Sequence, residues 1–268
     1  MLWDDDGPLS FQPSPAIRPA KAAVVRVLMA LIMFLTGTYV GVDWASYYYG
    51  FATRYSMGAG FVRTVLCAAL AWSVGENHVH RRDARLLGAA FAVTVVADYL
   101  IILHDQMMIG TLLFLLVHFT YIARHGQGFR ASLAPERRDR TLRFLAISAL
   151  VVYGLTGVLI WRVAPILARS GVLVIDSIYL FVVATSMWMA WGVFARDYYD
   201  RRNALYIAVG MTSFFICDVA VGVAAALGAT SSGRVLGNAV GFFYTPALVL
   251  VAYSGYKWLG PGAVMSRR

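Results

Sequence analysis

The chain has 268 residues, of which 60% are hydrophobic and only 14% are charged, and its formal net charge is +9. Soluble domains carry charge on roughly a quarter of their residues, so this composition excludes an ordinary soluble protein and predicts an integral membrane protein. The positive charge does not indicate a nucleic-acid partner, because the basic residues lie at the ends of apolar segments, where membrane insertion alone accounts for them.

Eight apolar segments are long enough to cross a bilayer, whose hydrocarbon core takes about 20 residues of helix. They cover residues 21–42, 59–76, 84–103, 107–124, 141–161, 172–195, 203–227 and 236–257. We therefore predict an all-α, polytopic membrane bundle of about eight transmembrane helices. Residues 21–258 form the predicted membrane domain, residues 1–20 a disordered cytoplasmic tail and residues 259–268 a short cytoplasmic tail.

The distribution of arginine and lysine predicts the orientation of these helices. Seventeen basic residues lie on the side of the predicted bundle that holds both chain ends, whereas five lie on the opposite side. Those five are Arg54, Arg63, Arg162, Arg169 and Arg234. Cytoplasmic loops carry the excess of basic residues, so we expect both termini in the cytoplasm. An even number of helices requires the same arrangement.

Two pairs of glycines have a spacing that favours close helix packing. Gly37 and Gly41 form a GxxxG pair in the first segment, and Gly237 and Gly241 form another in the last. This spacing permits two helix backbones to approach closely within a membrane. We expect close helix crossings at these positions.

Asp98 and Asp218 are isolated carboxylates within apolar segments, and they occupy the third and seventh segments. A carboxylate in hydrocarbon is costly, so such residues face the protein interior or a wet cavity and usually mark a functional site. At 1.5 Å of rise per residue, each lies roughly 20 Å from the cytoplasmic end of its helix. We therefore expect the two carboxylates to meet at one depth in a shared site, as its catalytic residues.

Further polar side chains fall near this level. Asp176 and Tyr179 enter the sixth segment from the outer side, and Tyr244 lies at a comparable depth in the eighth. His118 lies deeper in the fourth segment, with Tyr121 three residues later on the same helical face. We count His118 as a candidate catalytic residue, and the three tyrosines and Asp176 as candidate substrate-binding residues.

Two neighbouring carboxylates suit acid–base chemistry. In a low dielectric they cannot both ionise cheaply, so one tends to keep its proton. A general acid beside a general base suits reactions that pass through an oxocarbenium-like state. Two alternatives remain open: buried hydrogen bonds also serve only to hold helices together, and a transporter could bind a proton or cation between two halves of the bundle.

Other site chemistries have little support in the sequence. His118 and the aspartates are possible metal ligands, but no HxxxH, HExxH or cysteine pair accompanies them. Nucleotide-binding glycine motifs and the GxSxG motif of serine hydrolases are absent from the sequence. A retinal protein would need a lysine within a helix, whereas Lys21 and Lys257 lie at helix ends. We expect neither a metal nor a cofactor.

Residues 97–121 read A-D-Y-L-I-I-L-H-D-Q-M-M-I-G-T-L-L-F-L-L-V-H-F-T-Y. This stretch resembles the signature of the YhhN family of lysoplasmalogenases, which are small multi-pass membrane proteins. Asp98 falls on the family aspartate, Gly110 on its glycine, and His118 and Tyr121 on its H-x-x-Y motif.

The resemblance extends into the second half of the chain. S-F-F-I-C-D at 213–218 resembles the seventh span of the family, and G-F-F-Y-T-P-A-L-V-L-V-A-Y-S at 241–254 resembles its last span. The chain departs from the family pattern at Ala97, where a glycine is usual, and at Pro246, where a polar side chain is frequent.

The resemblance implies hydrolysis of the vinyl ether bond of lysoplasmalogens, which releases a fatty aldehyde and a glycerophospho-base. The implied partners are a lysophospholipid substrate and the lipid bilayer of a bacterial cell membrane, and no cofactor is implied. Hydrolysis begins with proton delivery to carbon, and water then captures the oxocarbenium ion. Asp98 and Asp218 are the expected acid and base, in an order that the sequence does not assign, with His118, Tyr121 and Tyr244 as hydrogen-bonding support.

Overall fold

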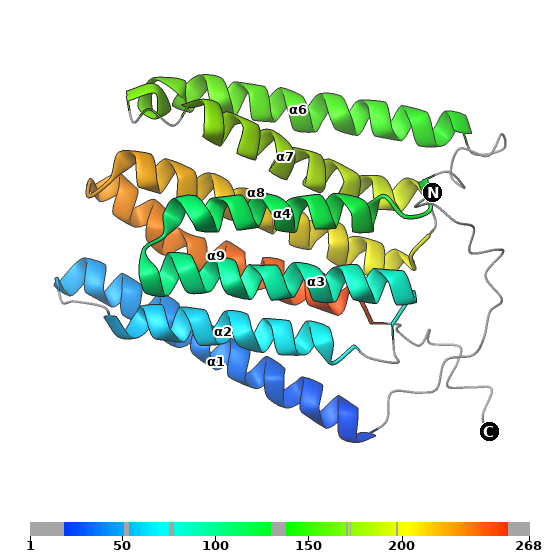
Figure 1. The fold of residues 1–268 in the computed structure, drawn as a ribbon, viewed down its shortest axis with the longest axis horizontal. Coiled ribbons are helices and arrows are strands. Elements are labelled where there is room, and N and C mark those ends of the chain that lie inside the picture. Colours follow the sequence, from blue (N-terminus) through cyan, green and yellow to red (C-terminus); the bar gives the residue numbers. More distant parts are fainter. Residues whose placement is uncertain are drawn as a thin grey trace.

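The structure is a computed structural model, and it describes residues 19–50, 54–74, 78–129, 138–169, 171, 173–196 and 198–256. Over these residues the chain forms long helices that run roughly side by side (Figure 1). The helices are α1 (Pro19–Tyr49), α2 (Arg54–Trp72), α3 (Arg81–Asp98), α4 (Met107–His125), α6 (Arg138–Arg169), α7 (Leu173–Gly192), α8 (Arg201–Leu227) and α9 (Ser231–Tyr253). A π-helical turn, η2 (Tyr99–Leu103), extends α3, and a 3-10 turn, η3 (Val193–Ala195), extends α7.

The prediction of an all-α polytopic membrane bundle is confirmed. Seven of the described helices are long and apolar enough to cross a membrane, and α2 has a shorter apolar stretch, Ser56–Trp72. The helix α1 continues seven residues beyond its predicted end at 42, and α6 continues to Arg169. The predicted tails, 1–20 and 259–268, lie outside the described residues except for 19 and 20, which belong to the first turn of α1.

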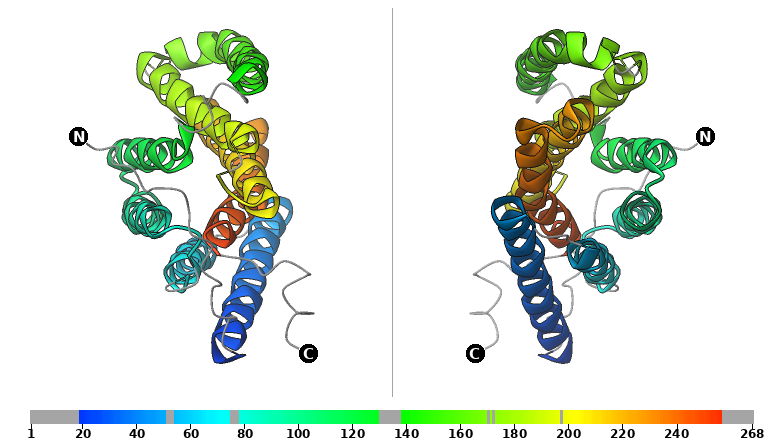
Figure 2. Two further views of the ribbon diagram at one scale, coloured as in Figure 1. Left: turned by 90° about the vertical axis from the view of Figure 1, so that its right-hand side faces the viewer. Right: turned by 90° about the vertical axis from the view of Figure 1, so that its left-hand side faces the viewer.

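Six of the helices form a closed ring. In order around it, α2 packs on α3, α3 on α4, α4 on α7, α7 on α8, α8 on α9, and α9 again on α2. In this order α3 and α8 occupy opposite positions. The helix α1 packs outside the ring against α2 and α9, and α6 packs mainly against α7. The end-on views show α1 and α6 at opposite extremes of the bundle (Figure 2).

Burial follows from this arrangement. Leucine, phenylalanine and methionine side chains of the ring helices, including Leu70, Phe91 and Met211, are fully buried in its interior. The two outer helices instead expose large apolar side chains, such as Phe34 on α1 at 70% and Leu150 on α6 at 77%. In water such exposure would be unfavourable, whereas in a bilayer these side chains contact lipid.

Only one of the four predicted GxxxG glycines lies at a tight crossing. A Cβ atom on Gly241 would lie 2.6 Å from the ring of Tyr39, so the missing side chain lets α1 approach α9. The other three glycines, Gly37, Gly41 and Gly237, have open space at the same position. For those three the prediction of a close helix crossing was wrong.

The two ends of the bundle differ in how the helices are joined. The end of α1 and the start of α2 lie at one end of the bundle, as do the corresponding ends of the pairs α3–α4, α6–α7 and α8–α9, and we call it the turn end (Figure 1). The first and last described residues, Pro19 and Tyr256, lie at the other end, which we call the terminal end. The expectation that the terminal end faces the cytoplasm stays a prediction.

Two arginines that were counted as loop charges are inside the bundle. Arg63 lies within α2 and is 2% exposed, and Arg124 lies within α4 and is fully buried. The interpretation of Arg63 as an end-of-helix charge was wrong, because α2 begins at Arg54 rather than at residue 59. One arginine is removed from each side of the count, so the excess of basic residues at the terminal end remains.

Candidate functional site

Asp98, the last residue of α3, is held by hydroxyl groups from two neighbouring helices. Thr64 on α2 donates its hydroxyl hydrogen to Asp98 Oδ2 over 2.6 Å, and Tyr244 on α9 donates to the same oxygen over 2.8 Å. The Asp98 residue is 4% exposed. Among the described residues the second oxygen, Oδ1, has no hydrogen-bond donor, so it is available to a ligand.

Asp218 on α8 is held in the same way from the other side of the ring. His118 Nε2 on α4 lies 2.9 Å from Asp218 Oδ2, and the Tyr179 hydroxyl on α7 donates to that oxygen over 3.1 Å. Here too Oδ1 has no donor among the described residues. Each of the six ring helices therefore contributes one polar side chain to this pair of hydrogen-bonded groups.

An aromatic ring connects the two groups. Phe214 lies one turn before Asp218 on α8, and its ring centre is 5.1 Å from that of His118 and 5.7 Å from that of Tyr244. The two groups thus meet on one aromatic ring, but each carboxylate has its own hydrogen-bond partners, and neither carboxylate is hydrogen-bonded to the other. The expected meeting of the two carboxylates in a shared catalytic site stays a prediction.

The backbone changes its winding directly after Asp98. The α-helix ends there and continues as the π-helical turn η2, a feature that occurs frequently at functional sites. Gly110 on α4 packs against this turn: a Cβ there would clash with the side chain of Ile101 and lie 3.3 Å from the carbonyl oxygen of Ala97. Only glycine fits this approach without displacing the segment that carries Asp98.

The depth of the site can be estimated along the helices. Asp98, Asp218 and Tyr244 lie about 8–20 Å from the turn end, at 1.5 Å of rise per residue. This places the polar groups within the membrane-spanning part of the bundle, where apolar side chains of the ring surround them.

The similarity to known proteins covers this ring. The family model of the YhhN family matches residues 58–255, which include all six polar residues of the site. The chain belongs to the YhhN family. The match begins within α2 and ends after α9, so that α1 lies outside it. No curated protein and no solved structure matches the chain.

Two other residues of the predicted YhhN site are placed differently from expectation. Tyr121 lies one turn after His118 on α4 and is fully buried. Its hydroxyl has no hydrogen-bond partner among the described residues. Its ring stacks on that of His125, with the ring centres 5.7 Å apart. Asp176 is half-buried and lies one turn nearer the turn end than Tyr179. Neither side chain is hydrogen-bonded to Asp98 or Asp218, whereas Tyr179 and Tyr244 are.

Sequence reasoning missed the contribution of α2. Thr64 donates to Asp98, and its neighbour Arg63 lies over the rings of Tyr39 and Tyr244. A threonine in an apolar helix carries no distinctive signal. An arginine in the middle of one does, because charges at that depth are rare and usually functional, but the misplaced start of α2 hid it.

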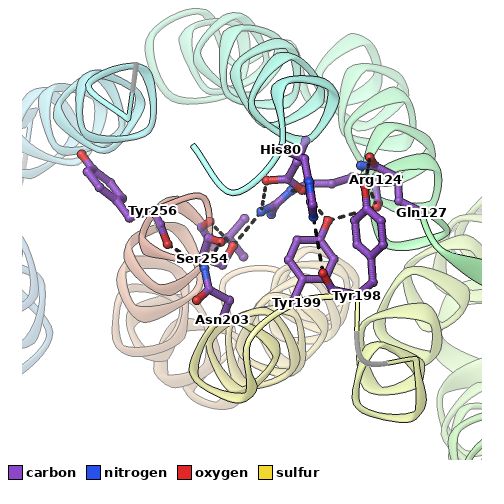
Figure 3. Close-up of polar contacts among 10 residues, drawn as sticks. His80, Arg124, Gln127, Tyr198, Tyr199, Asn203, Ser254 and Tyr256 are labelled. Carbon is purple, nitrogen blue, oxygen red and sulfur yellow. Dashed lines mark hydrogen bonds and ion pairs between the residues drawn. The ribbon is translucent and has the colours of Figure 1, made fainter. Parts of the chain in front are cut away.

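A second buried polar cluster lies at the terminal end (Figure 3). Arg124 forms a two-pronged ion pair with Asp83, in which Nε and Nη2 lie 2.7 and 3.0 Å from Oδ1 and Oδ2. Nη2 also donates to Ser254 over 2.9 Å, and the Tyr199 hydroxyl donates to Asp83. Both oxygens of Asp83 are occupied. The cluster joins α3, α4, α9 and the link before α8, so we interpret it as structural.

Tyr199 in this cluster lies outside the membrane-spanning helices, and Asn203 lies in the first turn of α8. Burial, followed by the charge of Asp83, raises the pKa of the Tyr199 phenol well above its usual value, so it remains a donor. Asn203 donates to the backbone carbonyls of Ser254 and Tyr256 over 2.7 Å each. These bonds fix the end of α9 to the start of α8.

Metal ligation has no geometric support in the described part of the chain. No group of three or more histidine, cysteine, aspartate or glutamate side chains there could hold a metal ion.

Proposed function

We propose that the protein is a membrane-embedded hydrolase of ether lysophospholipids that cleaves the vinyl ether bond of lysoplasmalogens. Membership of the YhhN family supports this class of reaction. The observation that carries the proposal is the matched pair of carboxylates on α3 and α8. Each has one oxygen bonded to two side chains and the other without a partner among the described residues, which supports two carboxyl groups acting on one substrate.

The reaction needs an acid that protonates the alkene carbon and a base that removes a proton from water. A proton adds to the alkene carbon farther from the ether oxygen, and an oxocarbenium ion forms at the other carbon. Water adds there and loses a proton, which gives a hemiacetal. The hemiacetal then breaks into the fatty aldehyde and the free hydroxyl of the glycerophospho-base. The overall change is the addition of one water molecule, and the protons released equal those supplied.

We assign the acid to Asp98. Thr64 and Tyr244 both donate to Oδ2, so a proton on this carboxyl group belongs on Oδ1, the oxygen that is free to meet the alkene. A general acid must be within hydrogen-bond reach of the atom that it protonates. The surrounding apolar side chains exclude bulk water, which protects the protonated acid and the reactive intermediate.

We assign the base to the Asp218–His118 pair. The free Oδ1 of Asp218 can take the proton that water loses and return it to the leaving oxygen, while His118 Nε2 holds the other oxygen in place. The negative charge of Asp218 also stabilises the positive oxocarbenium ion. The hydroxyl of Tyr179 holds Asp218 from the opposite side and orients it.

Product analysis tests the proposal. The purified protein in maltoside micelles is incubated with a mixed lysolipid extract, and the products are identified by mass spectrometry. We expect a fatty aldehyde and its glycerophospho-base, and loss of both with Asp98→Asn and Asp218→Asn. Asp139→Asn is the matched control, because Asp139 is exposed in the first turn of α6. Unchanged lipids, or full aldehyde release by both site variants, would refute the proposal.

A further inference from the structure

Arg63 is a buried cation, and two of its nitrogen atoms have no hydrogen-bond acceptor in the described part of the chain. It precedes Thr64 on α2 and is 2% exposed. Its Nε and Nη1 atoms have no acceptor among the described residues. A guanidinium group has five N–H donors and stays charged in proteins, and a buried charge without acceptors is strongly unfavourable. The position therefore requires an acceptor that these residues do not supply.

The guanidinium group lies beside the proposed acid. Its Cζ atom is 5.1 Å from the ring centre of Tyr39 and 5.1 Å from that of Tyr244. The hydroxyl of the same Tyr244 donates to Asp98, so the ring of one tyrosine spans the distance from Arg63 to Asp98. Cation–π contacts with two rings hold the planar group in place without using its N–H donors.

Carboxylates of neighbouring helices do not satisfy those donors. Neither Asp43 of α1 nor Asp98 is bonded to Nε or Nη1. A guanidinium group stays charged in proteins, and its directional N–H groups need an acceptor at hydrogen-bond distance.

We propose that Arg63 binds the phosphate group of the lysophospholipid substrate. The inference rests on the proposed function and adds to it the part of the substrate that fixes its position. A phosphodiester presents two anionic oxygens, which match the planar fork of a guanidinium group. In an ether lysophospholipid only the glycerol unit separates the phosphate from the ether oxygen. A phosphate held at Arg63 therefore places the vinyl ether near Asp98.

Binding measurements test this site without turnover. The ligands are a saturated 1-O-alkyl lysophosphocholine, which has no vinyl ether to hydrolyse, and the matching 1-O-alkylglycerol, which lacks the phosphate. Affinities are measured in maltoside micelles, which carry no phosphate of their own. We expect the wild type to bind the phospholipid about 10- to 100-fold more tightly than the alkylglycerol, as hydrogen bonds to a charged group would give.

Arg63→Gln should remove this preference, because it should lower the affinity for the phospholipid and leave the affinity for the alkylglycerol unchanged. The matched control is Arg234→Gln, because Arg234 also lies over a tyrosine ring, 5.5 Å from that of Tyr47, but is exposed at the turn end. The preference should be unchanged in that variant. An equal loss of affinity for both ligands in Arg63→Gln, or an unchanged preference, would overturn the assignment.

Two further arms keep the test decisive. Inorganic phosphate and glycerophosphocholine are added as competitors; displacement of the phospholipid by millimolar inorganic phosphate would identify a free-phosphate site and overturn the head-group assignment. If Arg63→Gln does not fold, Arg63→Lys replaces it. The wild-type measurements also test the assignment by themselves, because equal affinities of the wild type for the two ligands would overturn phosphate binding. Aldehyde release is scored separately, so failure of the proposed hydrolysis and failure of phosphate binding give different results.

Discussion

His118 on α4 and Asp218 on α8 are joined through Nε2 and Oδ2 at 2.9 Å, across sides of the ring that are separated by α7. The His118 side chain is fully buried and the Asp218 side chain is 10% exposed. An imidazole held this way is oriented by the carboxylate behind it. The pair thus links the packing of two helices to the proposed removal of a proton from water.

We expect His118→Gln to lower kcat for aldehyde release by about 10- to 100-fold, the range for a misplaced catalytic group. Glutamine keeps a hydrogen-bond donor toward Asp218 but lacks the rigid ring that positions it. The melting temperature should change little. Single-substrate kinetics with a synthetic lysoplasmalogen measure the effect, and a kcat within threefold of wild type would show that the imidazole does not position Asp218.

The two donors to Asp98 should act as a unit. Thr64→Val and Tyr244→Phe each remove one hydroxyl from Oδ2, and each should lower kcat about 10-fold and stability by about 1 kcal/mol. The double variant should lose less than the product of the two single effects, because interacting residues are not additive. A double-mutant cycle on kcat measures this coupling; strictly independent effects would contradict the arrangement.

Two tyrosines whose rings contact His118 provide a contrast. Tyr179 donates to Asp218, whereas the Tyr121 hydroxyl has no partner among the described residues. Tyr179→Phe should lower kcat about 10-fold, as expected for the loss of one hydrogen bond to a charged group. Tyr121→Phe removes an unsatisfied buried hydroxyl, so the melting temperature should stay the same or rise. A fall of several degrees would show that this hydroxyl has a partner in solution.

The position of Asp98 should depend on a glycine of the adjacent helix. Gly110→Val inserts a branched side chain against Ile101 and the Ala97 carbonyl. We expect a loss of about 1–3 kcal/mol, which is typical of overpacking, and a larger fall in kcat because the π-helical turn after Asp98 must shift. Gly154→Val, on α6 where a side chain meets open space, is the control for denaturation and activity assays.

The ion pair at the terminal end should contribute to stability and not to chemistry. Asp83→Asn or Arg124→Met alone leaves a buried charge without its partner, which costs about 3–5 kcal/mol. The double substitution should recover most of that loss, because replacing both charges is often nearly neutral. Thermal unfolding measures the stability, and kcat per folded molecule should stay within about threefold. A large loss of kcat in the stable double variant would place this cluster in the mechanism.

The sequence was sufficient to predict the helices and the two central carboxylates. Long apolar runs with few charges specify membrane helices, and Asp98 and Asp218 are conspicuous because little else in those runs is charged. The end of α1 was placed too early because Asp43 interrupts the apolar run, yet the helix continues to Tyr49. A helix satisfies its own backbone within the bilayer, so one partly buried aspartate does not end it.

The partners of those carboxylates could not be predicted. Thr64 is 34 residues and Tyr244 is 146 residues from Asp98 along the chain. Which helices meet is decided by the order of the ring, which local periodicity does not encode. The same holds for Asp83 and Arg124, which are 41 residues apart. The depth of a residue along its helix can be counted from the sequence. The direction in which its side chain points within the bundle is known only from the packed structure.

Deuterium labelling tests the central claim most directly. Lysoplasmalogen is hydrolysed by the wild-type protein in heavy water, and the aldehyde is reduced at once to the alcohol, so that later exchange is prevented. If Asp98 delivers a proton to the alkene carbon, the product carries one deuterium at the carbon next to the former aldehyde carbon, and Asp98→Asn forms none of it. Aldehyde without that deuterium, or labelled aldehyde formed at the wild-type rate by Asp98→Asn, would contradict the account.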